Sequence, residues 1–303
     1  MNTIFEGGVT SPKGFLAAGE ACGIKKNGKK DIAIISSIDT AVAAGVFTTN
    51  KVKGHSLQVT MEHIKSGYSR ALVINSGNAN ACIGEQGYKD ATEMAALTAN
   101  LLQCEPEEIL VGSTGVIGVP LNMPSVRAGI RLAVQRLSEN GGHDAEEAIM
   151  TTDLRPKEIA IEVEIQDAKV IIGGMAKGSG MIHPNMATMI GVITTDANIS
   201  RGLLDKALKE VVKKTFNRVS VDGDTSVCDM VIALANGEAN NSGIVKENVD
   251  FEAFKKGVEY VCTFLSKEIV KDGEGATKLV EIAVNGALSE EDAYNTVCSV
   301  AKS

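Results

Sequence analysis

Apolar residues in this 303-residue chain fall into short runs with two different spacings. Some runs are aliphatic and bounded by polar residues or glycine, which is typical of buried strands. These predicted strands cover residues 31–37, 71–76, 109–113 and 277–284. Apolar and acidic residues alternate over 159–165, and apolar residues return over 170–174, which predicts a hairpin that turns at 166–167.

Elsewhere apolar residues recur every three or four positions, as they do on one face of a helix. The predicted helices cover residues 88–103, 124–137, 201–215 and 252–270, and a last helix begins near Ser289. Pro124 stands in the first turn of its helix, where proline is tolerated, and Ser200 is a suitable N-cap for the third. Strands and helices in mixed order indicate an α/β or α+β fold.

Composition excludes several classes of protein. The net charge of −8 argues against nucleic acid as a main partner, because phosphate binding needs a basic patch. Lysines cluster only at 25–30, which we interpret as a solvated hairpin turn. No apolar run approaches the roughly 18 residues of a membrane helix. Six cysteines lack CxxC spacing and the N-terminus lacks a signal-peptide pattern, so we expect free thiols in the cytoplasm.

Thr188 is the candidate nucleophile. A glycine-rich stretch at 173–180, expected to be a flexible loop, leads through a bend at Pro184 to Thr188, which opens an apolar strand. Without that context a threonine here is simply a strand former. Its hydroxyl is a weak nucleophile that needs a base. If the bond between Ala187 and Thr188 is cut, the new α-amino group, with an ordinary pKa of about 8, can serve as that base.

Other polar segments offer weaker signals. Residues 112–118 supply backbone N–H groups and the Thr114 hydroxyl, which suit either an oxyanion hole or a plain turn. The polar loop at 75–84 is a hydrogen-bond knot or a site wall. Residues 222–225 resemble the start of a calcium loop, but the ligands do not continue at the required spacing, so we expect no metal. His183 lies near Thr188, and we assign it no catalytic role.

Together these segments form an ordered set that resembles the ornithine acetyltransferase (glutamate N-acetyltransferase) family of arginine biosynthesis. The matching stretches are GGVTSPKGFLAAG at 7–19, AGVFTTN at 44–50, NSGNANAC at 75–82, GSTGVIG at 112–118, IMTTD at 149–153, AKGSGMIHPNMATMI at 176–190, SVDGDTS at 220–226 and DGEGATK at 272–278. The resemblance implies an αββα sandwich and a chain that cuts itself between Ala187 and Thr188. The two pieces are then 1–187 and 188–303.

The resemblance also implies an activity. Thr188 takes the acetyl group of N2-acetylornithine, and glutamate then collects it. Thr114 and Gly115 match the oxyanion-hole positions. The matching substrate-binding positions are Thr188, Lys177, Glu274 and one of Thr151 and Thr152. No cofactor is implied, although acetyl-CoA is an optional second acetyl donor of a multifunctional enzyme. The pieces are expected to assemble as an α/β hetero-oligomer such as a heterotetramer.

Three departures from the family pattern are visible. Family members continue beyond the position of Ser303 and draw substrate contacts from that tail, so the chain is expected to be C-terminally truncated. Val227 and Cys228 stand where Thr-Asn is usual, and Ile83 replaces a threonine. Two alternatives therefore stay open. One is a related self-cleaving threonine amidase or aminopeptidase, with water as the acceptor. The other is a fragment without catalytic activity.

Overall fold

The computed structural model describes residues 1–166, 168–183 and 189–301. Within these residues nine strands form a single sheet in the order β1-β6-β7-β8-β9-β3-β4-β5, and β2 pairs with β3. The strands are β1 (Asn2–Ile4), β2 (Phe15–Glu20), β3 (Ile32–Phe47), β4 (Tyr68–Asn78), β5 (Ile109–Val116), β6 (Glu158–Ile165), β7 (Ala168–Lys177), β8 (Ile190–Thr195) and β9 (Met230–Ala235).

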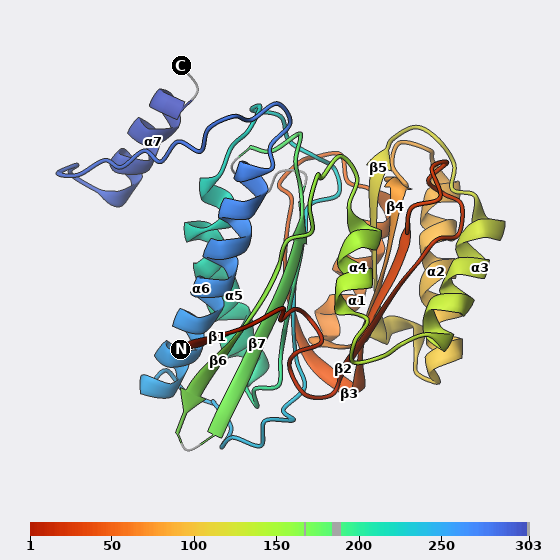
Figure 1. Cartoon of the computed structure of the whole chain (residues 1–303), viewed down its shortest axis with the longest axis horizontal. Coiled ribbons are helices and arrows are strands. Elements are labelled where there is room, and N and C mark those ends of the chain that lie inside the picture. Colours follow the sequence, from red (N-terminus) through yellow and green to blue (C-terminus); the bar gives the residue numbers. More distant parts are fainter. Residues whose placement is uncertain (167, 184–188, 302–303) are drawn as a thin grey trace.

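Seven α-helices accompany the sheet in the described part of the chain. They are α1 (His55–His63), α2 (Glu85–Leu102), α3 (Met123–Gln135), α4 (Gly142–Ile149), α5 (Arg201–Lys214), α6 (Val249–Lys271) and α7 (Glu290–Ala301). In Figure 1, α7 stands apart from the sheet, and none of its residues is buried. No helix of the described residues has the length and apolar character needed to span a membrane.

The long strand β3 divides the sheet into two layers. Its register shifts between Ser36 and Ala41. Before the shift it pairs with β2 and β4, and after it pairs mainly with β9 and keeps two residue pairs with β4. Such an irregularity bends a strand, so the two parts of the sheet can face each other. A buried core lies between the layers and joins Phe15 and Ile35 from one to Val192 and Ile232 from the other.

Helices cover both outer faces of this double layer. On one side, α5 and α6 pack on β6 to β9 through residues such as Val211 and Leu265. On the other, α2 and α3 pack on β3 to β5 through residues such as Met94 and Ile130. Figure 1 shows these two helix pairs at opposite sides of the molecule. The order of layers is therefore helix, strand, strand, helix, which confirms the expected αββα sandwich.

Most of the predicted elements are present. The helices expected at 88–103, 124–137, 201–215 and 252–270 are α2, α3, α5 and α6, and α7 begins one residue after Ser289. The hairpin of β6 and β7 closes with Ile165 opposite Ala168, as predicted. The pattern did not reveal α1, α4 or β9. The predicted bend at Pro184 and the strand start at Thr188 lie outside the described residues.

Two local predictions are wrong. Residues 173–177 belong to β7 rather than to a loop, because they pair with β8 along their whole length and with β6 over 173–175. Glycine is needed at 173 because the Gly8 carbonyl oxygen lies 2.2 Å from where a Cβ would stand. Residues 277–284 form no strand, since no strand of the described residues pairs with them, and Val280 is exposed. The 25–30 segment connects the antiparallel strands β2 and β3 and is mostly exposed, as predicted, but Lys25 within it is half-buried, and this burial lowers its pKa to about 8.

Candidate active site

Three of the predicted site residues meet at the end of β7. The ammonium group of Lys177 donates hydrogen bonds to the Thr151 hydroxyl at 2.7 Å and to the Thr114 hydroxyl at 3.4 Å. Lys177 is only 2% exposed, and this burial lowers its pKa although the nearby Asp153 carboxylate favours the charged form. Thr152, by contrast, is exposed. The geometry therefore distinguishes the two neighbouring threonines.

A buried ionic network contacts Lys177 through Asp153. Lys157 binds Asp153 at 2.8 Å and Asp272 at 2.6 Å, and all three residues are buried. The Lys177 ammonium lies 3.9 Å from the other oxygen of Asp153. Burial opposes ionisation of Asp153, but the ammonium groups of Lys177 and Lys157 outweigh it and lower its pKa to about 2. Sequence reasoning missed this network, because Lys157 carries no motif and Asp272 is 115 positions away.

The predicted oxyanion residues lie where β5 runs beside β4. Thr114 is buried opposite Ser76, and Gly115 is exposed opposite Gly77. At Gly115 φ is +130°, and a Cβ would come within 2.4 Å of the Gly77 carbonyl carbon. Only glycine fits such a backbone at such a distance. The strand end therefore turns its amides in a way that an ordinary residue could not adopt.

Glu274 is tied to the glycine-rich segment that follows Lys177. Its amide donates to the Ser179 carbonyl at 3.1 Å, and the Ser179 hydroxyl donates to the Asp272 carbonyl at 2.7 Å. A Cβ on Gly180 would come within 2.6 Å of the Glu274 carboxyl carbon. The carboxylate of Glu274 thus lies close to Gly180, and Gly180 is three residues after Lys177.

The predicted nucleophile Thr188 and its cleavage partner Ala187 lie outside the described residues. The residues on both sides of them are held by one segment. Asp222 accepts the amides of Met181 and Ile182, the latter at 2.9 Å. On the far side, Asp229 accepts the amide of Met189 at 3.0 Å.

The structure also gives partners to Asp222, the possible calcium ligand, and to His183, the histidine near Thr188. The carboxylate of Asp222, which resembled a calcium ligand, is occupied by main-chain amides. No group of three or more metal-binding side chains lies together in the part of the chain that is described. The Nδ1 atom of His183 lies 3.1 Å from the Ser220 hydroxyl, within hydrogen-bond distance.

The polar loop at 75–84 is a hydrogen-bond knot. Asn75 accepts from the Ser113 hydroxyl at 2.6 Å and donates to the Asn78 carbonyl at 2.8 Å. Asn80 donates to the Gly87 carbonyl at 2.9 Å. These contacts join β4 to β5 and to the start of α2. They hold the strand that carries Thr114 in place.

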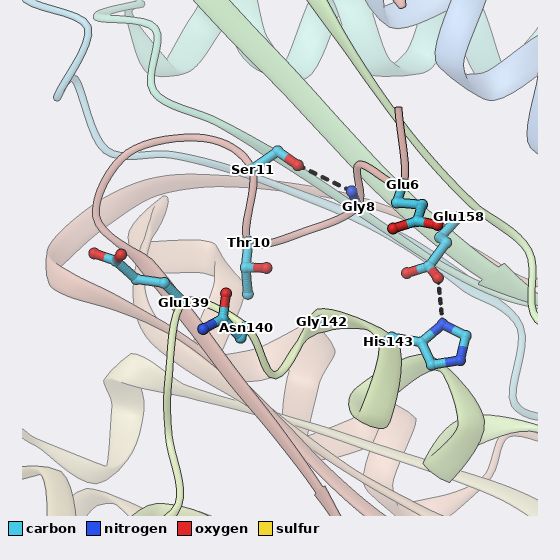
Figure 2. Close-up of a pocket in the computed structure, with 9 residues that line it drawn as sticks. All are labelled: Glu6, Gly8, Thr10, Ser11, Glu139, Asn140, Gly142, His143 and Glu158. Carbon is cyan, nitrogen blue, oxygen red and sulfur yellow. Dashed lines mark hydrogen bonds and ion pairs between the residues drawn. The ribbon is translucent and has the colours of Figure 1, made fainter. Parts of the chain in front are cut away.

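A separate pocket of about 260 Å³ lies at the start of α4 (Figure 2). Its lining residues are Glu6, Gly8, Thr10, Ser11, Glu139, Asn140, Gly142, His143 and Glu158. Figure 2 shows the His143 ring bonded to the Glu158 carboxylate, and this bond raises the pKa of His143. None of the predicted site residues that the structure describes lines this pocket, so it is distinct from the cluster around Lys177.

Comparison with known proteins places this geometry in context. A model of the ArgJ family matches residues 16–303. The arginine biosynthesis bifunctional protein ArgJ of Symbiobacterium thermophilum is 53% identical over 296 residues, which are 97% of this chain and 74% of that protein. The ArgJ 1 protein of Clostridium acetobutylicum is 52% identical over 292 residues, covering 96% of this chain and 72% of that protein.

Solved structures give the same picture. The ArgJ protein of Bacillus halodurans is 41% identical with a TM-score of 0.58, over 61% of this chain and 97% of that chain. The ornithine acetyltransferase of Mycobacterium tuberculosis, solved with ornithine, is 39% identical with a TM-score of 0.57, over 60% and 97%. An aminopeptidase of Ochrobactrum anthropi, a variant of the Ntn hydrolase fold, shares the fold with 13% identity and a TM-score of 0.52, over 90% and 89%.

Proposed function

Because the chain belongs to the ArgJ family, we propose that it is an acetyltransferase of arginine biosynthesis that moves the acetyl group of N2-acetylornithine to glutamate. The carrier of the acetyl group is Thr188, freed as an N-terminal residue by cleavage after Ala187. The observation that carries this proposal is the meeting of Lys177, Thr151 and Thr114 at one buried point, although they come from three separate segments.

The cleavage proceeds by attack of the Thr188 hydroxyl on the carbonyl carbon of Ala187. The C–N bond of that peptide breaks, the hydroxyl proton passes to the departing nitrogen, and an ester joins the two residues. Water then hydrolyses the ester, which leaves a carboxylate on Ala187 and a free hydroxyl and amine on Thr188. The amine has the position and the ordinary pKa of about 8 that a base for its own hydroxyl requires.

The sheet allows this cleavage without separating the pieces. In the proposed division, piece 1–187 contributes β7 and β3, and piece 188–303 contributes β8 and β9. Since β8 and β9 lie between β7 and β3, the cut pieces stay joined by two strand pairings. The length of the crystallised Bacillus halodurans chain is consistent with the division. It is 97% covered by 61% of this chain, or about 185 residues, which is close to the length of the proposed piece 1–187.

Acetyl transfer then follows in two steps. The Thr188 hydroxyl attacks the acetyl carbonyl of N2-acetylornithine, its proton passes through the amine to the departing α-nitrogen, and ornithine leaves. The α-amine of glutamate attacks the acetyl-threonine ester, and the proton returns to the threonine oxygen. In each step a negative charge develops on the carbonyl oxygen, for which the Thr114 hydroxyl and the amide of Gly115 are the proposed donors.

Lys177, Thr151 and Glu274 are the proposed substrate-binding residues. A buried ammonium group such as that of Lys177 suits the α-carboxylate that both substrates share. The Glu274 carboxylate is exposed above the same segment and suits the side-chain ammonium of ornithine. Thr151 rather than Thr152 is proposed as the contact, since only Thr151 bonds Lys177.

The proposal includes several features of the whole enzyme. No cofactor takes part, and acetyl-CoA serves as an optional second donor, in line with the bifunctional name of the relatives. The two pieces assemble as an α/β hetero-oligomer such as a heterotetramer. Six unpaired cysteines suit a reducing compartment, so the cytoplasm is the proposed location.

Purified protein tests the proposal directly. We expect two bands on a denaturing gel, with Thr188 as the first residue of the smaller one, and ornithine and acetylglutamate as products. Thr188→Ala is expected to give one uncut, inactive chain. Release of acetate without acetylglutamate favours the amidase alternative, and cut protein without turnover favours a non-catalytic fragment. Acetyl transfer by an uncut wild-type chain contradicts the proposed base.

A further inference from the structure

Asp229 holds the residue that directly follows the proposed nucleophile. One carboxyl oxygen of Asp229 accepts the Met189 amide at 3.0 Å. In return, the Met189 carbonyl accepts the amide of Met230 at 3.2 Å, so both polar backbone groups of Met189 are engaged by two consecutive residues. Of these two hydrogen bonds, only the one from the Met189 amide to Asp229 involves a side chain, so a substitution of Asp229 can remove it.

The carboxyl group of Asp229 is buried and only partly hydrogen-bonded. The residue is 1% exposed, and its second oxygen is buried without a hydrogen bond of good geometry from any described residue. Burial raises the pKa of Asp229 well above its usual range, although the Met189 amide, the nearby Ser226 hydroxyl and the Lys177 ammonium favour ionisation. Burial likewise raises the pKa of the adjacent Cys228 thiol, to about 12.

We propose that Asp229 is a positioning residue for self-cleavage and acetyl transfer, which acts through the hydrogen bond that its carboxyl accepts from the Met189 amide. The nitrogen of that amide is covalently bonded to the carbonyl carbon of Thr188. A group that holds this nitrogen therefore limits the motion of the nucleophile's own backbone. The inference rests on the proposed function, and it adds a residue to which the family resemblance gave no role.

A neutral carboxyl suits this task better than a carboxylate does. An ionised Asp229, hydrogen-bonded to the residue that follows the newly formed amine, would stabilise the ammonium form, which cannot act as a base. A protonated carboxyl keeps one accepting oxygen and adds no charge. Asparagine offers the same accepting oxygen with nearly the same shape, and alanine offers none. The two substitutions therefore separate the loss of the bond from the loss of the titratable group.

Asp196 provides a matched control at the other end of β8. It is also fully buried, and its carboxyl accepts two main-chain amides, that of Ile171 at 2.7 Å and that of Lys13 at 3.2 Å. Removing it costs backbone hydrogen bonds of the same kind, but far along the strand from position 188. A purely structural role of Asp229 predicts that the Asp196→Ala and Asp229→Ala variants behave alike.

The experiment follows cleavage of the full chain after pulse-labelled cell-free synthesis, on denaturing gels over about pH 6 to 8. We expect Asp229→Ala to slow cleavage about 100-fold, as a small misplacement of a reacting group can. Asp229→Asn should stay within about five-fold of the wild type with an unchanged pH profile, because it keeps the acceptor. Asp196→Ala should be cut at the wild-type rate even where its thermal stability falls as far as that of Asp229→Ala.

Three outcomes overturn the inference. A wild type that is cut, with Asp229→Ala cut equally fast, removes the role of Asp229 and leaves the proposed function standing. An Asp229→Asn variant as slow as Asp229→Ala shows that the accepting oxygen is not what matters. A wild type that is never cut removes the proposed function and this inference together.

Discussion

The ammonium group of Lys177 and the hydroxyl of Thr151 lie 2.7 Å apart, although the residues are 26 positions apart in the chain. Lys177 ends strand β7, and Thr151 lies just after α4. Because Lys177 is buried, its remaining protons have few partners other than Thr114 and Asp153. An ammonium group in such a position attracts a carboxylate more strongly than an exposed one does, since little water competes.

The first prediction uses the two adjacent threonines as a matched pair. Thr151→Ala removes the hydroxyl that orients the Lys177 ammonium, so we expect the KM for N2-acetylornithine to rise about five-fold, in line with roughly 1 kcal/mol for one hydrogen bond. Thr152→Ala should leave KM unchanged, because the hydroxyl that bonds Lys177 is that of Thr151. Steady-state kinetics of both variants decides the matter, and a larger effect at Thr152 contradicts the assignment.

The second prediction separates activity from stability at Lys177. Lys177→Met should lower kcat/KM roughly 10- to 100-fold, the effect of losing a hydrogen bond to a charged group. The free energy of unfolding should fall only slightly, because losing the attraction between Lys177 and Asp153 is offset by no longer burying the Lys177 charge, and Asp153 keeps Lys157 as a partner. Urea unfolding beside kinetics tests both halves, and a large loss of stability would show a structural role instead.

The third prediction concerns the proposed oxyanion donor. Thr114→Val keeps the shape of the buried side chain and removes its hydroxyl, so we expect kcat to fall about 100-fold, with roughly 3 kcal/mol less stabilisation of the developing charge. Thr114→Ser retains the hydroxyl and should recover most of the rate. If the valine variant is as fast as the serine variant, the hydroxyl of Thr114 takes no part in the reaction.

Much of the candidate site can be proposed from the sequence because its residues lie in compact motifs. GSTGVIG at 112–118 and AKGSGMIHPNMATMI at 176–190 point to Thr114 and Lys177 without any structure. Helix periodicity likewise located α2, α3, α5 and α6, since each buries one face along a long segment. Such a helix can be recognised from its own sequence, because its buried residues recur at regular spacing within one continuous segment.

The remaining features depend on partners far away in the chain. Gly173 is read locally as part of a loop, but the backbone of Gly8 packs against it and makes it a strand residue. Nothing near Lys157 marks it as buried, since its partner Asp272 is 115 positions away. Residues 277–284 have the composition of a strand, but a strand also needs a neighbour to pair with. Such relations appear only in three dimensions.

The last prediction follows from the ionic network under the site. Asp153 has a pKa of about 2 in the folded protein, against about 3.9 in an unfolded chain, so the folded state binds its proton less readily. Its contribution to stability is therefore complete above about pH 5 and is lost as the pH falls through about 2. The depressed pKa corresponds to roughly 2 to 3 kcal/mol at neutral pH.

Asp153→Asn should lower the free energy of unfolding at pH 7 by roughly 3 kcal/mol, because the buried Lys157 and Lys177 lose a shared counter-charge. The difference between variant and wild type should shrink as the pH is lowered from about 5 towards 2, where the wild-type carboxyl itself becomes protonated. Urea unfolding at several pH values measures this difference, with Asp205→Asn at a half-exposed ion pair as a control that should stay near zero throughout. A difference that stays constant down to about pH 2 would mean that the effect of Asp153 on stability does not come from its charge.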